Sequence, residues 1–222
     1  MISGELLSIL QLTLVVALAA TLVMLPPGVA LAWWLARSQS WLKAPVETLV
    51  TLPLVLPPVA TGFLLLRLLG RRGWFGAVLD RAGIDIIFTW KALVIAMVVM
   101  GLPLVVRSAR AGFEQGTRRF EQMAETLGAG PLRVFLTISL PLARRSVLAG
   151  ALLGFSRALG EFGASMVIAG SIPGETRTVS LAMYGFLETG RDQDAATLAV
   201  ASLVIAFVAV WISNRLVREG AY

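Results

Sequence analysis

The sequence predicts an all-α polytopic membrane protein with about five transmembrane helices. Of its 222 residues, 57% are hydrophobic and only 14% are charged, whereas about 25% of the residues of a soluble domain are charged. Several uncharged runs approach or exceed the ~20 residues with which a helix crosses a bilayer. Mean hydropathy over the whole chain is +0.82. We therefore expect residues 1–222 to form a single membrane domain with no soluble domain beside it.

Five uncharged or nearly uncharged runs mark the expected spans, at residues 6–36, 48–66, 92–106, 142–169 and 195–214. The third run is short, so its helix is expected to extend past Lys91, whose ammonium group can reach the lipid interface. The first run has no basic segment before it, and we expect it to be retained as a span. Short surface helices are expected in two connections, around residues 74–82 and 179–187.

Prolines interrupt three of these runs. Pro26 and Pro27 are expected to break the first helix, because proline cannot donate a helical hydrogen bond. Three prolines within residues 53–58 indicate that the second helix is not straight. Such a break can mark a transport pathway, or it can be a kink that fits the packing of neighbouring helices. We favour the kink, because proline is common in membrane spans. Pro103 implies a similar kink in the third span.

The distribution of Lys and Arg predicts the orientation in the membrane. If the N-terminus is outside, the inner segments carry 11 basic residues and the outer segments carry 7, with Arg157 inside a span. The positive-inside rule therefore places the N-terminus outside and the C-terminus in the cytoplasm. An odd number of spans without an internal repeat also means that a symmetric pathway would need a second chain.

Composition argues against several functional classes. The chain has no Cys and no His, which removes disulfides, thiol nucleophiles and the usual ligands of zinc and haem, so no metal site is expected. The nucleotide-binding patterns GxxxxGKS and GxxxxGKT are absent. The net charge of +6 is assigned to membrane topology rather than to nucleic-acid binding. An intramembrane enzyme would need convergent catalytic side chains, whereas only Arg157 and Glu161 are charged deep in a span.

A charged amphipathic stretch at residues 118–141 separates two of the apolar segments. Its apolar residues recur at the i, i+3, i+4, i+7 spacing that places side chains on one helix face, and they are Phe120, Met123, Ala124 and Leu127. Glu121 and Glu125 lie off that face, and Gly128 ends the helix. A short helix of this kind fits the groove of another protein or lies on lipid headgroups. The local pattern leaves both readings open.

Arg157 and Glu161 have the i, i+4 spacing that allows an ion pair on one helix face. Unpaired charges inside a membrane are costly, so the two are expected to be partners. The pair either locks the helix, which we favour, or forms part of a gate. Small residues around it would line a constriction in the gate reading, namely Gly160, Gly163, Ala164 and Ser165. Close helix packing is the simpler reason for such residues.

The stretch at 118–141 resembles the cytoplasmic signature of permease subunits in ABC importers. That signature is Glu-Ala-Ala, three residues, Gly, nine residues, Ile, one residue and Leu-Pro. The last four positions match here at Gly128, Ile138, Leu140 and Pro141. The spacing agrees at every one of them over about 20 residues.

Two positions depart from the signature. Gln122 stands where the family has Glu, and Met123 stands where it has Ala, whereas Ala124 matches. The Glu of the family commonly helps to hold the ATPase subunit. Either Glu121 or Glu125 takes that role here, or the salt bridge is absent.

Nearly the whole chain, from about residue 12 to 216, is similar to the molybdate branch of the molybdate/sulfate permease family. The segments that carry this likeness are LPLVLPPVATGFLLL, GRRGWFG, TLGAGPLRVFLTISLPL, ALGEFGASMVIAG and IPGETRTVSLAMY. The resemblance implies the transmembrane domain of a type I ABC importer and transport of molybdate, from which tungstate is chemically hard to separate. A sulfate or thiosulfate importer is the alternative, and a self-contained channel is an alternative of another class.

The resemblance also implies the partners. They would be a second copy of the chain, two cytoplasmic ATPase subunits that bind ATP-Mg, a periplasmic or lipid-anchored molybdate-binding protein, and the lipid of the bacterial cytoplasmic membrane. The chain itself would be non-catalytic and bind no cofactor. The region at 118–141 would be the coupling-helix region, and its apolar helix face would enter the ATPase cleft. The residues expected to couple are Phe120, Glu121, Gln122, Met123, Ala124, Glu125, Leu127, Gly128, Ile138, Leu140 and Pro141.

Overall fold

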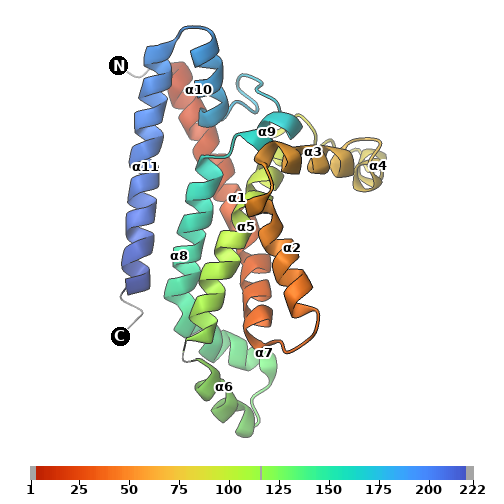
Figure 1. Cartoon of the computed structure of the whole chain (residues 1–222), viewed down its shortest axis with the longest axis vertical. Helices are drawn as coiled ribbons and strands as arrows, with labels where there is room; N and C mark the ends of the chain where they lie inside the picture. The colour runs from red at the N-terminus through yellow and green to blue at the C-terminus, as the bar shows by residue number, and fades with distance from the viewer. Residues whose placement is uncertain (1–3, 116, 219–222) are drawn as a thin grey trace.

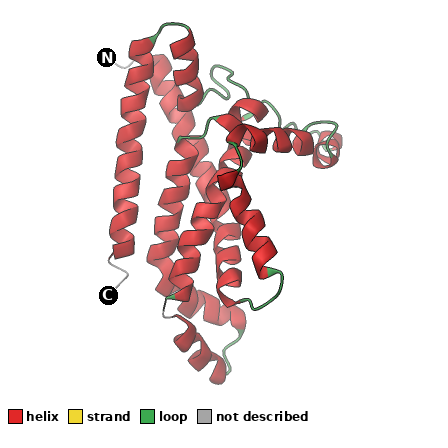
Figure 2. Ribbon diagram, in the orientation of Figure 1, coloured by secondary structure: helices red, strands yellow, loops and turns green. Residues whose placement is uncertain are grey.

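The computed structural model describes residues 4–115 and 117–218, within which all regular secondary structure is helical (Figure 2). Long helices run along the long axis of the molecule (Figure 1), namely α1 (Gly4–Arg37), α5 (Trp90–Glu114), α8 (Leu140–Leu159) and α11 (Asp192–Arg218). Among the described residues, four helical segments are long and apolar enough to cross a membrane, or five if the bent pair α2 (Lys43–Val55) and α3 (Pro58–Leu69) is one span. This confirms the prediction of a polytopic α-helical chain with about five spans.

The core lies where α1, α5 and α8 meet, and glycine allows their close approach. A Cβ atom on Gly101 of α5 would lie 3.0 Å from the sulfur of Met24 on α1 and 3.2 Å from the carbonyl oxygen of Gly154 on α8. Met24 is fully buried there. Small residues at such contacts let membrane helices gain dispersion contacts that lipid would otherwise make.

The first helix differs from the sequence-based expectation, because α1 continues through Pro26 and Pro27 without a break. Both prolines lack the N–H group that would bond four residues back, yet their fixed φ angle remains helical. Gly28 follows directly and lies against α5, where a Cβ atom would be 2.8 Å from a methyl carbon of Val105. Close packing against α5 accounts for the continuity of the helix at this point.

The second span is broken between α2 and α3, which are bent by 116°. Leu56 and Pro57 are extended, with ψ angles of 142° and 132°. Each precedes a proline, and the clash with the proline ring pushes the preceding residue out of the helical region. The prediction that this helix is not straight is confirmed, and the bend is larger than a packing kink.

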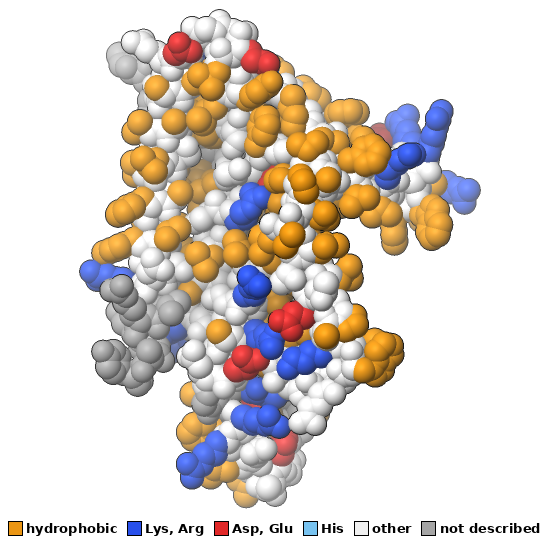
Figure 3. Space-filling model, in the orientation of Figure 1, with side chains coloured by type: hydrophobic (Ala, Val, Ile, Leu, Met, Phe, Trp, Pro, Cys, Tyr) orange, Lys and Arg blue, Asp and Glu red, His pale blue; other side chains and the backbone are white. Residues whose placement is uncertain are grey.

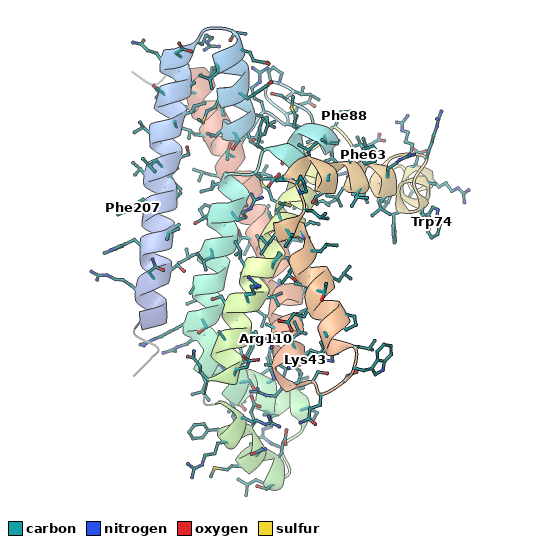
Figure 4. All side chains as sticks on the ribbon, viewed as in Figure 1. Lys43, Phe63, Trp74, Phe88, Arg110 and Phe207 are labelled. Atoms are coloured by element: carbon teal, nitrogen blue, oxygen red, sulfur yellow. The ribbon has the colours of Figure 1, made fainter. Side chains whose placement is uncertain are left out.

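Beyond the bend, α3 and the short helix α4 (Trp74–Arg81) form an arm that projects sideways from the bundle (Figure 1). The helix expected around residues 74–82 is thereby confirmed. The arm carries Arg side chains beside hydrophobic ones (Figure 3). Below the bend, Arg110 of α5 holds α2 through an ion pair of 2.6 Å with Glu47, and it also contacts Glu114 at 2.7 Å (Figure 4).

The fourth span begins and ends earlier in the sequence than expected, because it covers Pro131–Leu159. Helix α8 stops at Leu159, and a separate helix α9 (Gly163–Ile168) packs on α3 instead of continuing the span to residue 169. Gly160 ends α8 with a near-zero ψ of 10°. Ahead of α8, the helix α7 (Pro131–Val134) and the π-helical segment η1 (Phe135–Ser139) run directly into it.

Helix α10 (Val179–Glu188) confirms the second predicted short helix, and contacts from α1 hold it. The buried hydroxyl of Thr13 accepts a hydrogen bond of 2.9 Å from the N–H of Val179, the first residue of α10. Such a bond satisfies one of the free N–H groups at a helix start. Nearby, Arg191 pairs with Glu5 at 2.9 Å and with Asp194 at 2.7 Å. Hydrogen bonds to these two carboxylates raise the pKa of Arg191 above its usual value.

The contact between α3 and α9 gives a prediction about stability. A Cβ atom on Gly62 would lie 2.7 Å from the Cα of Ala164 and 2.8 Å from its carbonyl oxygen. Because backbone atoms cannot move aside, Gly62→Ala should destabilise the protein by about 1–3 kcal/mol. We expect a lower melting temperature for this variant when thermal unfolding of the purified protein in detergent is followed by circular dichroism.

Gly185→Ala in α10 is the matched control, because no heavy atom lies within 4 Å of its would-be Cβ. The same substitution there should be neutral or stabilise by about 0.5–1 kcal/mol, since alanine is the better helix former. Equal melting temperatures for the two variants would contradict the proposed packing of α3 on α9.

Candidate functional site

Helix α6 (Thr117–Thr126) lies at the end of the molecule where α11 also ends, opposite the start of α1 (Figure 1). Gly128 terminates it with a φ of +84°, a conformation that glycine adopts without steric cost. The N–H of Ala129 then donates to the carbonyl of Ala124 at 3.0 Å. Such bonds satisfy the free carbonyls at a helix end. The helix predicted within residues 118–127 is present at this position.

The large apolar side chains of the α6 region point away from the rest of the chain. Phe120 is 53% exposed, Met123 56% and Leu127 88%, whereas the smaller Ala124 is half-buried. Keeping such side chains in water is unfavourable by about 25 cal/mol for each Å² of apolar surface. A contiguous exposed apolar patch of this kind marks a surface that binds a protein or a membrane.

Glu121 points the other way, into the protein, and it is only 5% exposed. Its carboxylate accepts two hydrogen bonds from the guanidinium of Arg37, at 2.5 and 2.6 Å. The hydroxyl of Ser139 donates a third, also at 2.5 Å. Gln122 and Glu125 are exposed. Of the two glutamates considered for contact with a partner, Glu125 is accessible and Glu121 is enclosed within its own chain.

The remaining signature residues return the chain from α6 to the bundle. Pro141 is exposed at the start of α8, and Ile138 and Leu140 are half-buried. Leu140 packs with the cluster that contains Leu35 of α1. In the same segment the ring of Phe135 meets Trp33 edge-on, with centroids 5.2 Å apart. The fixed spacing from Gly128 to Leu140 and Pro141 therefore corresponds to the length of chain that turns after α6 and re-enters the bundle.

The structure brings Arg157 and Glu161 together as an ion pair of 2.8 Å. The Glu161 side chain has no exposed surface, and its second oxygen accepts the N–H of Ala164 at 2.9 Å, near the start of α9. Arg157 is 26% exposed. The expected pairing is thus present, although α8 ends between the two residues and the carboxylate also caps α9.

The small residues near this pair lie mostly in a packed contact. Gly163, Ala164 and Ser165 are buried, with Gly163 against Pro58 and Ala164 against Gly62 of α3. Gly160 alone among the four is exposed. This arrangement agrees with close helix packing as the reason for small side chains.

Arg37 and Ser139 are site residues that sequence reasoning missed. In the sequence, Arg37 is one of the 11 basic residues of the inner segments, and Ser139 lies between two signature positions without belonging to the signature. Their separation from Glu121, by 84 and 18 residues, leaves no local pattern that connects them. Within the described residues, no group of three or more acidic, His or Cys side chains could hold a metal ion.

Comparison with known proteins agrees with this architecture. Residues 28–219 match the family model of the binding-protein-dependent transport system inner membrane component. The molybdenum transport system permease protein ModB of Haemophilus influenzae is 41% identical over 218 residues, which cover 96% of this chain and 95% of that protein. The ModB protein of Escherichia coli K12 is 45% identical over 93% of this chain and 91% of its own length.

A more distant sequence relative and several solved structures also match. A chloroplastic sulfate permease of Chlamydomonas reinhardtii is 34% identical over 96% of this chain and 57% of its own length. A chain of a bacterial alginate ABC transporter superposes with a TM-score of 0.73 at 18% identity, covering 98% of this chain and 80% of its own. A chain of the MetNI methionine ABC transporter gives 0.68 at 16% identity, covering 98% and 95%. This protein therefore belongs to the family of binding-protein-dependent transport system inner membrane components.

Proposed function

We propose that the chain is the permease subunit of an ATP-driven importer that moves molybdate across the bacterial cytoplasmic membrane by alternating access. One observation carries the proposal: relatives named molybdenum transport system permease proteins match 93–96% of the chain at 38–45% identity. Tungstate is so similar to molybdate in charge and shape that the same pathway would carry it.

The energy source would be a pair of ATPase subunits in the cytoplasm. The sequence contains neither GxxxxGKS nor GxxxxGKT, so ATP hydrolysis falls to a partner. The exposed apolar patch of Phe120, Met123 and Leu127 offers that partner a docking surface. The end of the molecule that carries α6 would then face the cytoplasm, which agrees with the 11 basic residues assigned to the inner segments. The N-terminus would lie outside, where an oxyanion-binding protein delivers the substrate.

A second copy of the chain would complete the pathway. Helix α11 exposes large apolar side chains along its middle, such as Leu203 and Phe207. Figure 4 shows Phe207 pointing outward, and this face suits lipid. Arg157, by contrast, is partly exposed although it belongs to a spanning helix. A charge at that depth avoids lipid and faces protein or a water-filled space. The side of the molecule with Arg157 is therefore the side on which we place the pathway and the second copy.

Sulfate or thiosulfate import is the second candidate, and the sulfate permease of Chlamydomonas at 34% identity favours it. The relatives named for molybdenum transport reach higher identity. Sulfate and molybdate are both tetrahedral dianions, so the architecture of the permease suits either, and only a competition measurement separates them.

The direct test is uptake in proteoliposomes that contain the chain, its ATPase subunits and its binding protein. We expect ATP-dependent accumulation of labelled molybdate that excess tungstate suppresses and excess sulfate does not. Equal suppression by sulfate would establish the second candidate instead. Accumulation that continues without ATP would contradict an ATP-driven importer and favour a channel.

We propose that the ion pair of Arg157 and Glu161 locks the junction of α8 and α9 beside the pathway, with Gly160, Gly163, Ala164 and Ser165 shaping that junction. Arg157→Ala leaves the enclosed carboxylate of Glu161 without its partner, which should cost about 3–5 kcal/mol. We expect less assembled complex and little uptake from this variant, measured by size-exclusion chromatography and by molybdate transport.

A double variant in which both residues are uncharged tests whether the pair holds the junction of α8 and α9 or whether Arg157 contacts the transported anion. In the double variant Arg157→Gln with Glu161→Gln, no buried charge remains, and the amide oxygen at position 161 can still accept the Ala164 N–H. We expect assembly and most of the uptake to return. A double variant that assembles normally and does not transport would show instead that the guanidinium of Arg157 acts on the anion.

A further inference from the structure

We infer that Glu121 is a positioning residue that joins helix α6 to the ends of three membrane-spanning helices, and that it does not contact the ATPase subunit. The inference rests on the proposed function, because it concerns how movement of an ATPase bound to α6 reaches the membrane. It also assigns a role to the buried carboxylate of Glu121, a residue that lies just before the family signature and is not part of it.

The geometry forms a compact polar hub. Both oxygens of the Glu121 carboxylate accept from Arg37, the last residue of α1, in a two-pronged arrangement. Arg37 also donates to the carbonyl oxygen of Phe113, next to the end of α5, at 3.0 Å. The hydroxyl of the fully buried Ser139 completes the hub directly before α8. Two parallel bonds to a guanidinium fix orientation as well as distance.

The other described side chains of α6 contribute little burial against the rest of the chain. The helix has ten residues, and isolated helices shorter than about 12–15 residues are marginal in water. Among its described side chains, at residues 118–126, Glu121 alone is buried. The apolar side chains that could otherwise anchor it point outward instead. The attachment of α6 to the bundle therefore depends strongly on one charged side chain.

The same geometry separates Glu121 from the signature position beside it. Neighbouring residues on an α-helix point about 100° apart. Gln122 is accordingly exposed while Glu121 is enclosed. When ATPase closure displaces the exposed face of α6, the ion pair passes that displacement to α1, and through Arg37 and Ser139 to α5 and α8. Without the carboxylate, α6 would move with the ATPase while the bundle stays behind.

The first arm of the test measures coupling in the complete reconstituted complex. For Glu121→Gln we expect the ATPase subunits to remain bound and ATP hydrolysis to continue, while molybdate taken up per ATP falls about tenfold, within the usual range of coupling between sites. Arg37→Gln should have the same effect. The double variant should be no worse than either single one, because all three lack the same interaction. It also leaves no unpaired charge, so it tests the idea even if a single variant folds poorly.

The second arm measures position and does not depend on transport. The chain has no Cys, so Arg107→Cys in α5 and Arg119→Cys in α6, both exposed, accept two specific spin labels. We expect a narrow distance distribution between the labels in the complex, both without nucleotide and with ATP. Adding Glu121→Gln should broaden it, whereas adding Glu125→Gln, which removes an exposed carboxylate from the same helix, should leave it narrow.

Three results would overturn the inference. The first is an unchanged molybdate uptake per ATP in Glu121→Gln. The second is loss of ATPase binding in that variant, which would make Glu121 a docking contact. The third is a distance distribution between the labels that Glu121→Gln leaves unchanged. A parent complex that does not couple ATP to molybdate uptake would refute the proposed function instead, and the distance measurement would still decide whether Glu121 holds α6.

Discussion

Charged side chains that lie deep in the protein or in a membrane span need a partner, because a lone charge there is costly. Ion pairs join helices at three levels of the structure. At one end Arg191 ties Glu5 to the start of α11. At the junction of α8 and α9, Arg157 neutralises Glu161. At the other end Arg37 fixes Glu121. Each pair lies where a helix begins or ends, so the ion pairs determine how the helices are joined.

Between these pairs, proline and glycine determine where helices bend and where they pack closely. Paired prolines have opposite effects in two places. In α1 they are carried through a continuous helix, whereas Pro57 and Pro58 produce a bend of 116°. Neighbouring residues account for the difference: Gly28 lets α1 press against α5, while the residues before Pro57 and Pro58 are forced into extended backbone. Because of the bend, α3 lies against α9. Glu161 accepts a hydrogen bond from Ala164 in α9, so the ion pair of Glu161 with Arg157 lies beside this contact.

Much of this could be predicted from the sequence, and the failures have physical causes. Uncharged runs gave the spans and the 3.6-residue spacing gave α6, because hydrophobic periodicity is a local property. The end of α8 at Leu159 was missed because residues 142–169 form one predominantly apolar run, and length alone does not reveal a turn. The continuity of α1 depends on packing against α5. The partner of Glu121 lies 84 residues away, so only the folded chain identifies it.

The central claim is that the exposed face of α6 is where an ATPase subunit docks, and Leu127 offers the most direct measurement. Its side chain is 88% exposed, so Leu127→Glu should leave the fold intact while placing a charge on the proposed docking surface. We predict that binding of the purified ATPase subunit weakens at least about tenfold, as for a residue that contributes strongly to an interface. Leu187→Glu, an exposed leucine of α10 at the opposite end (Figure 1), should bind it normally. Unchanged binding by a correctly folded Leu127→Glu variant would contradict the account.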